Sequence, residues 1–224
     1  MIKVSNFQFL KSLKDNNDRT WFADHKQEYL QEQQEIEAFA DELLDGLNKQ
    51  DVIETLSGKK SLYRIYRDTR FSKDKTPYKT HWSGSFKRAG KSRRGSYYFQ
   101  LEPGNTFIGG GFWGPNADDL KLVRESLAFD AAPLREILQA PDFIADFKAL
   151  QGDQLKTAPK GFDTTHPDID LIRYKQFLLV KRFSDAEVLN GNFAELVVQT
   201  FVNMRPFLNY MSEILTTDAN GLDL

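Results

Sequence analysis

The hydrophobic periodicity of the sequence changes along the chain, and the order of these changes restricts the fold more than any other feature. Residues 1–55 follow a helical pattern, whereas residues 60–113 are rich in aromatic and β-branched residues separated by turn signals. Residues 116–150 are helical again, and residues 173–217 contain a strand and a C-terminal helix. This order predicts an α+β fold, a single domain over residues 1–224 with a mainly antiparallel central sheet flanked by N-terminal and C-terminal helices.

Two helices are expected before the strands. The first covers residues 6–13 with Ser5 as its N-cap, and Asn16 lies in the turn that follows. The second is a long helix over residues 19–49, which Asp18 caps and whose apolar residues mostly recur at helical spacings.

The middle of the chain predicts a series of neighbouring strands. Their composition and turn signals place them at residues 61–67, 81–88, 95–104 and 105–115. The basic run KRAGKSRRG, residues 87–95, is expected to join two neighbouring strands as a mobile hairpin tip.

The remaining elements follow Pro115. A helix begins at the capping residue Asn116, and two short helices begin at the prolines of residues 132–140 and 141–150. A strand is expected over residues 175–183, and an amphipathic helix with a kink at Pro206 over residues 193–217.

The charges are distributed unevenly along the chain. Residues 59–94 hold 13 Lys and Arg against 2 Asp, a balance of +11, although the whole chain carries a net charge of −2. The rest therefore carries 17 basic and 30 acidic residues, a balance of −13. This separation indicates either a site for an anionic partner or a basic segment that packs against the chain's own acidic helices.

The densest part of this segment is YRIYRDTRFSKDKTPYKTHW, residues 63–82. If it starts as a strand, Tyr63 and Ile65 face the core, Arg67 lies at the core's edge, and Asp68 orients a neighbouring Arg through two hydrogen bonds. Arg supplies a planar fork for phosphate or carboxylate, and Lys adds mobile charge. The segment therefore predicts an anion-binding site made of Arg64, Arg67, Asp68, Arg70, Lys73, Lys75, Tyr78 and Lys79.

These residues resemble the motif of an uncharacterised bacterial family, a domain of unknown function defined by RxxRDxRFxxx[DN]KxxY. The residue types of the motif occur in the same order, with two residues rather than three between Phe and the acidic position; they are Arg64, Arg67, Asp68, Arg70, Phe71, Asp74, Lys75 and Tyr78. The stretches NNDRTWF and GGGFWGP also look like the family's plan, so the resemblance covers most of the chain. It implies that the charged stretch is the family's hallmark, and it implies no activity.

Other possible sites are less well supported by the sequence. The triple glycine at residues 109–111 matches no phosphate-binding loop. It indicates a bulge or a close approach to the backbone, either by a packed aromatic such as Trp113, which is favoured, or by a ligand near the basic loop. His166 lies among three Asp residues without the spacing of a known metal motif, so these acids are interpreted as caps and no metal site is predicted. His81, directly after the basic loop, is the candidate general base if the protein is an enzyme.

Three functions remain open at this stage. The favoured one is binding of a small anionic or phosphorylated ligand, as an enzyme or as a binding protein, through the basic loop. The alternatives are a nucleic-acid-binding module that uses residues 59–94 and a protein-interaction domain for an acidic partner. The sequence indicates no particular cofactor or oligomeric state.

The composition restricts the cellular setting. The chain has no Cys, which excludes disulfides, thiolate catalysis and Cys-based zinc sites. No apolar run approaches the ~20 residues that cross a bilayer, and the N-terminus lacks the apolar region of a signal peptide. A cytoplasmic protein without membrane contact is therefore expected.

Overall fold

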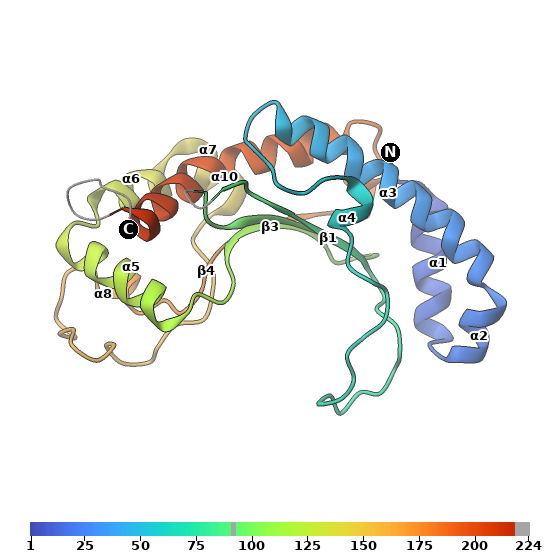
Figure 1. Cartoon of the computed structure of the whole chain (residues 1–224), viewed down its shortest axis with the longest axis horizontal. Helices are drawn as coiled ribbons and strands as arrows, with labels where there is room; N and C mark the ends of the chain where they lie inside the picture. The colour runs from blue at the N-terminus through green and yellow to red at the C-terminus, as the bar shows by residue number, and fades with distance from the viewer. Residues whose placement is uncertain (91–92, 218–224) are drawn as a thin grey trace. The chain divides into compact units, whose positions relative to one another are not determined.

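The computed structural model describes residues 1–90 and 93–217. Its sheet is antiparallel and four-stranded, with the strands side by side in chain order (Figure 1). The strands are β1 (Trp82–Lys87), β2 (Ser96–Leu101), β3 (Thr106–Phe112) and β4 (Phe177–Phe183). Helices precede and follow these strands, which confirms the predicted α+β class and the antiparallel sheet.

The chain forms two compact units. Unit 1 comprises Met1–Lys87, Tyr98–Ile108 and Arg182–Gln199. Unit 2 comprises the described residues within Arg88–Tyr97, Gly109–Lys181 and Thr200–Leu224. Strands β2, β3 and β4 and helix α10 (Phe193–Thr216) contribute residues to both units.

The helices of unit 1 differ from the prediction at two points. They are α1 (Val4–Asp15), α2 (Arg19–Asp24), α3 (Lys26–Asn48), α4 (Gly58–Ser61) and α9 (Asp185–Val188). The predicted helix over 19–49 is interrupted at His25, whose ring stacks on Trp21 with centroids 3.9 Å apart while its backbone leaves the helical region. Ser5 is not the first cap, because α1 already begins at Val4 and the Ser5 hydroxyl donates to Glu32 at 3.0 Å. The Asp18 cap is confirmed, since its carboxylate accepts the backbone N–H groups of Thr20 and Trp21.

The two faces of the sheet differ within unit 1. Phe99 and Leu101 in β2 are fully buried, and the Phe99 ring lies 5.9 Å from that of Phe39 in α3. Figure 1 shows α3 along this face of the sheet. Because side chains alternate along a strand, Tyr98 and Gln100 project from the opposite face, here called the open face, where Tyr98 is partly exposed although Gln100 is buried. The core of unit 1 therefore lies between α3 and one face of the sheet.

Unit 2 contains the later helices where the capping signals place them. They are α5 (Ala117–Phe129), α6 (Ala132–Gln139), α7 (Pro141–Phe147), α8 (Ile169–Ile172) and most of α10. Asn116 caps α5 by accepting the N–H of Asp119 at 2.8 Å, and prolines occupy the first positions of α6 and α7. Pro206 lies inside α10, and its kink stays a prediction. Among the described helices, none combines the length and the apolar character that crossing a membrane requires.

The triple glycine is closely packed as expected, but Trp113 is the wrong partner, because the nearest atoms are backbone atoms of neighbouring strands and the Met204 side chain. Gly111 has a φ of 123°, and a Cβ there would overlap the carbonyl oxygen of Phe177 in β4. The neighbouring Trp113 is instead 74% exposed. The glycines therefore serve the close approach of β3 and β4 rather than a site next to the basic loop.

The run KRAGKSRRG joins β1 and β2 as predicted, but its ends are fixed. Arg88 is 1% exposed, and its guanidinium donates to the side chains of Asn209 and Ser212 in α10. Arg94 pairs with Asp119 at 2.6 Å. The mobile tip predicted between them falls partly on residues 91–92, which lie outside the described residues.

Candidate functional site

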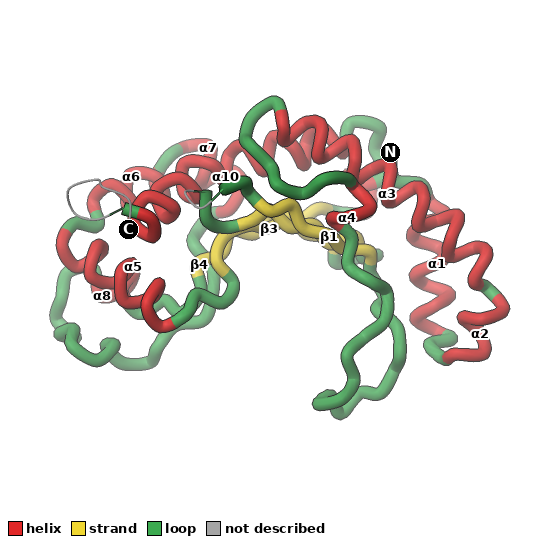
Figure 2. The backbone as a smooth tube through the Cα atoms, in the orientation of Figure 1, coloured by secondary structure: helices red, strands yellow, loops and turns green. Residues whose placement is uncertain are grey.

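Residues 62–79 form an irregular antiparallel ribbon, here called the basic ribbon. Isolated bridges join Leu62 to Gly84 and Tyr66 to Tyr78, and the N–H of Arg67 donates to the Pro77 carbonyl at 2.8 Å. Figure 2 draws the segment as loop, so the regular strand predicted at 61–67 is wrong. Pro77 lacks an N–H, so it cannot return a bond to the opposite backbone, and the ladder stays incomplete.

The base of the basic ribbon is fixed to the turn between α1 and α2. The Asn17 amide donates to the Tyr78 carbonyl at 3.0 Å and accepts the Tyr78 N–H at 3.1 Å. The Tyr78 ring stacks on Phe22 with centroids 4.0 Å apart, and Tyr78 is only 5% exposed. Burial raises the pKa of the Tyr78 hydroxyl. This anchoring gives the otherwise loop-like ribbon a defined position on unit 1.

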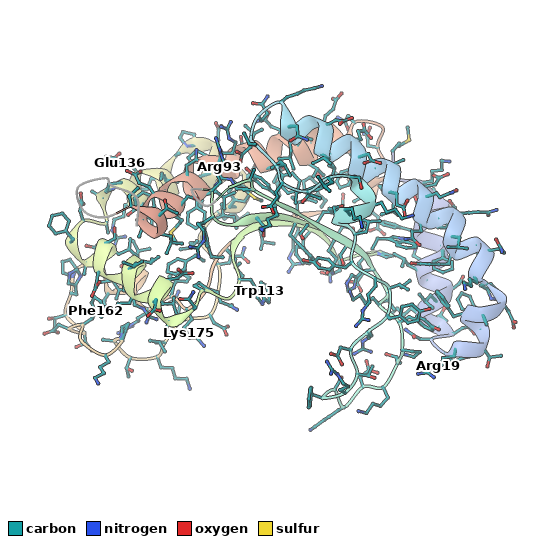
Figure 3. All side chains as sticks on the ribbon, in the orientation of Figure 1. Arg19, Arg93, Trp113, Glu136, Phe162 and Lys175 are labelled. Carbon is teal, nitrogen blue, oxygen red and sulfur yellow. The ribbon has the colours of Figure 1, made fainter. Side chains whose placement is uncertain are left out.

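A pocket of about 720 Å³ lies where the ribbon meets this turn. It combines side chains that are some 50 residues apart in the sequence. The lining residues are Asn17, Asp18, Arg19, Tyr66, Arg67, Thr69, Lys75, Thr76, Pro77 and Tyr78. We call it the ribbon pocket; Figure 3 labels Arg19 on its α2 side.

The lining of the ribbon pocket is positively charged. Three cations, Arg19, Arg67 and Lys75, stand against one carboxylate, Asp18, a balance of +2. The Asp18 carboxylate already accepts two backbone N–H groups of α2, which disperses its charge. Within the described part of the chain, neither Arg19 nor Lys75 has a carboxylate partner, although the Lys75 Nζ donates to the Thr69 carbonyl at 2.8 Å. The pocket therefore favours an anion.

Arg67 is held in place by its neighbours in the ribbon. Its Nη1 donates to Asp74 Oδ2 at 2.5 Å and also to the hydroxyl and carbonyl of Thr76. Asp74 accepts the Thr76 N–H as well, and this bond, with the Arg67 guanidinium and the Thr76 hydroxyl, lowers the pKa of Asp74 to about 2. Among the described residues, the Nε and Nη2 of Arg67 have no partner. Asp74 thus orients the guanidinium and leaves its outer edge available.

The other predicted anion-binding residues lie outside the pocket lining. Asp68 and Arg70 bind each other, with Arg70 Nε and Nη2 at 3.0 and 2.6 Å from the two carboxylate oxygens. This confirms the expected bidentate pair, and it lowers the pKa of Asp68. Arg64 and Lys73 are exposed, and Lys79 lies over the Tyr63 ring, where burial lowers its pKa. Of the predicted set, the pocket brings together only Arg67, Lys75 and Tyr78.

His81 and Tyr63 are found on the open face of the sheet. His81 precedes β1 in register with Ser83, and burial lowers the pKa of its imidazole despite the nearby Glu102 carboxylate. It does not line the ribbon pocket. Tyr63 is 51% exposed, so its prediction as a core residue is wrong, whereas Ile65 is buried as expected. Residues 62–66 do not form a regular strand, so the alternation that placed both side chains on one face does not hold there.

The acids around His166 serve other partners. Asp168 and Asp170 pair with Arg135 at 2.8 and 2.7 Å, and Asp163 accepts the Thr165 N–H. The cap prediction is wrong for Asp168, whose carboxylate makes no bond to the start of α8. In the residues that the structure describes, no three His, Asp or Glu side chains gather closely enough to hold a metal ion.

The pocket residues that sequence reasoning missed are those of the α1–α2 turn. Asn17, Asp18 and Arg19 lie far from the basic ribbon in sequence, and the cap at Asp18 and the family resemblance of NNDRTWF did not indicate a binding role for them. Their role depends on the Asn17–Tyr78 bonds, which span 61 residues. No pattern of neighbouring residues in the sequence predicts a contact over such a separation.

Comparisons with known proteins identify a family. No curated protein and no solved structure matches the chain. A family model described as "Conserved hypothetical protein (DUF2461)" matches residues 5–210, which include the α1–α2 turn, the basic ribbon and the whole sheet. The chain therefore belongs to this conserved hypothetical family.

Proposed function

We propose that the protein binds a small anionic or phosphorylated ligand in the ribbon pocket, through Arg19, Arg67 and Lys75. The observation that carries the proposal is the excess of cations around a concave space of about 720 Å³. Pockets for small ligands are typically ~300–1,000 Å³, with a few placed polar groups. A phosphoryl or carboxylate group there would neutralise Arg19 and Lys75, which have no carboxylate partner among the described residues, and would accept from the outer edge of Arg67.

Each cation has a distinct part in this proposal. Arg67 presents its Nε and Nη2 edge to the ligand in a forked geometry that suits two anion oxygens. Lys75 keeps two of its three donors after its bond to Thr69. Arg19 closes the site from the α2 side. His81, the candidate general base, is not among the lining residues.

The basic segment as a whole offers less to a nucleic acid than its sequence suggests. Arg88 is buried and Arg94 is paired with Asp119, so two cations of the proposed 59–94 footprint are engaged inside unit 2. Binding to nucleic acid through this segment and docking of an acidic protein stay predictions. The ribbon pocket is favoured because its cations converge on one space.

A thermal-shift screen tests the proposal. The purified protein is heated with nucleotides, sugar phosphates, polyphosphate or citrate, each at low and moderate salt. A ligand at 100 times its dissociation constant stabilises a protein by ~2.7 kcal/mol. For a chain of this size we expect a rise in Tm of roughly 5–11 °C, at ~2–4 °C per kcal/mol.

The variants Arg67→Ala and Arg70→Ala form a matched pair. Both remove a guanidinium from the same ribbon, but Arg70 is outside the pocket and pairs with Asp68. Loss of a hydrogen bond to a charged group costs ~1.5–3 kcal/mol, so Arg67→Ala should weaken the ligand about 10- to 150-fold. Arg70→Ala should leave affinity within about twofold. Equal effects of the two variants, or no stabilising anion in the screen, would contradict the proposal.

A further inference from the structure

Three aromatic rings lie in a row across the open face of the sheet in unit 1. Tyr63 comes from the basic ribbon, Tyr98 from β2 and Phe107 from β3. The Tyr63 and Tyr98 ring centroids are 6.3 Å apart, and those of Tyr98 and Phe107 are 5.6 Å apart. We call these three residues the aromatic row.

The aromatic row is not part of the core. The neighbours of Tyr98 in β2, Tyr97 and Phe99, are fully buried, so the core takes the other side of the strand. Ile108 in β3 is fully buried as well, whereas Phe107 and Tyr98 are only partly buried and Tyr63 is 51% exposed. Aromatic side chains gathered on a solvent-facing surface contribute less to stability than buried ones. Such a group of rings therefore indicates a surface that binds a partner.

Each end of the row carries a cation. The Lys79 Nζ lies 5.4 Å from the centroid of the Tyr63 ring, and the Arg182 guanidinium carbon lies 5.7 Å from that of Phe107. Arg182 also donates to the side chain of Asn105 at 2.8 Å, which fixes its position beside the row. The three rings therefore lie between two cations.

Polar contacts hold the rings in place. The Tyr63 hydroxyl lies 3.0 Å from Ser85 Oγ in β1, and the Tyr98 hydroxyl donates to Gln100 at 3.0 Å. Gln100 in turn donates to the Glu102 carboxylate, which also accepts from Asn105. Because these donors engage Glu102, its charge is partly offset where the row ends in β2. The rings are thus preorganised, which lowers the entropy cost of stacking a ligand on them.

We propose that the aromatic row is a stacking platform for single-stranded nucleic acid, with Lys79 and Arg182 contacting its phosphates. Every base has a π-face that stacks on an aromatic ring, and cations at both ends complement a polyanion rather than a neutral sugar or peptide. None of the row's rings lines the ribbon pocket, and an open surface favours an extended ligand over a small molecule. A sheet with helices on one face and aromatic residues on the other is a known architecture for reading two or three unpaired bases.

Fluorescence anisotropy with short labelled oligonucleotides tests this inference. Single-stranded DNA and RNA of about ten nucleotides are titrated at low and moderate salt, with a duplex of the same sequence as a control. We expect single strands to bind more tightly than the duplex, because paired bases cannot stack on the row. We also expect affinity to fall as salt rises, less steeply for Lys79→Gln and Arg182→Gln.

Ring variants separate stacking from charge. Tyr98→Leu and Phe107→Ala should each weaken binding about 5- to 150-fold, the effect of losing one stacked base. Tyr98→Phe keeps the ring and should retain near wild-type affinity, which guards against a simple folding defect. Phe71→Ala is the matched control, since Phe71 is 95% exposed in the same unit but outside the row.

The outcomes distinguish this inference from the proposed function. Arg67→Ala should leave oligonucleotide affinity within about twofold, and Tyr98→Leu should leave the thermal shift with a small anion unchanged. Absence of binding at low salt would overturn the inference. So would a duplex that binds as tightly as the single strand, or a loss in Phe71→Ala equal to that in Phe107→Ala.

Discussion

At the scale of single residues, His81 lies between charges of opposite sign, and its titration reports the geometry of the open sheet face. Burial lowers the pKa of the His81 imidazole, Glu102 raises it and Lys79 lowers it. We therefore expect His81 to titrate below the ordinary histidine value of ~6.5. Glu102→Gln should lower the pKa further, and Lys79→Met should raise it. NMR titration of the ring protons of His81 measures all three values.

The lowered pKa of His81 also determines how the stability of the protein changes with pH. A depressed histidine pKa means that the folded protein binds the proton less tightly than the unfolded chain. The contribution of His81 to stability is therefore complete above the unfolded value of ~6.5 and falls as pH drops toward the folded value. In the variant His81→Gln, the urea midpoint should depend less on pH between these two values. A pKa that moves in the same direction in Glu102→Gln and Lys79→Met would contradict the assigned neighbours.

At the scale of elements, α4 is positioned by backbone contact with α3. A Cβ at Gly58 would overlap the Asp41 backbone nitrogen and the Glu37 carbonyl oxygen, and the Gly58 N–H donates to the Asp41 carboxylate at 2.5 Å. Backbone atoms of a helix cannot move aside as side chains do, so Gly58→Ala should destabilise the protein by ~1–3 kcal/mol. Urea denaturation measures this loss.

Gly114 supplies the control for Gly58→Ala. No heavy atom lies within 4 Å of a Cβ placed there, so Gly114→Ala should change the free energy of unfolding by less than ~0.5 kcal/mol. A similar loss in both variants would mean that the effect arises from glycine's backbone freedom in general. A neutral Gly58→Ala would mean that α4 does not pack on α3 as closely as the structure has it.

Elements also mark the limit of what the sequence could predict. The order of helices and strands follows from local periodicity and caps such as Asp18 and Asn116, and the structure has this order except for the strand predicted at 61–67. The interruption at His25 and the incomplete ladder opposite Pro77 depend on individual contacts that no periodicity encodes. The high density of basic residues in the sequence was enough to predict Arg67 and Lys75 as site residues.

The remaining pocket residues required the folded chain. Arg19 joins the ribbon pocket only because the Asn17 amide binds the backbone of Tyr78, 61 residues away. Likewise, Asp68 and Arg70 looked like ligand-binding residues but neutralise each other over two positions. The aromatic row assembles from three separate segments, so sequence reasoning placed Tyr63 in the core and gave Phe107 no role.

At the scale of the whole molecule, the connectivity of the two units bears on how the protein unfolds. The chain passes between units at 87/88, 97/98, 108/109, 181/182 and 199/200, which makes five passages. Strands β2, β3 and β4 are each divided by one of these boundaries. Separate unfolding of one unit would therefore have to break strands and helix α10 partway along their length.

We accordingly expect a single cooperative transition over the chain, in keeping with the prediction of one domain. Urea curves from far-UV circular dichroism and from tryptophan fluorescence of a Trp113→Phe variant should coincide, because the remaining Trp21 and Trp82 report on unit 1 and the dichroism reports on all helices. The variant Gly58→Ala sharpens the test, since it perturbs unit 1 alone. Under mild urea it should speed hydrogen exchange in α5, which belongs to unit 2, as much as in α3. If exchange in α5 is unchanged while α3 exchanges faster, the units unfold independently and the protein has two domains, whereas Gly114→Ala should alter exchange in neither helix.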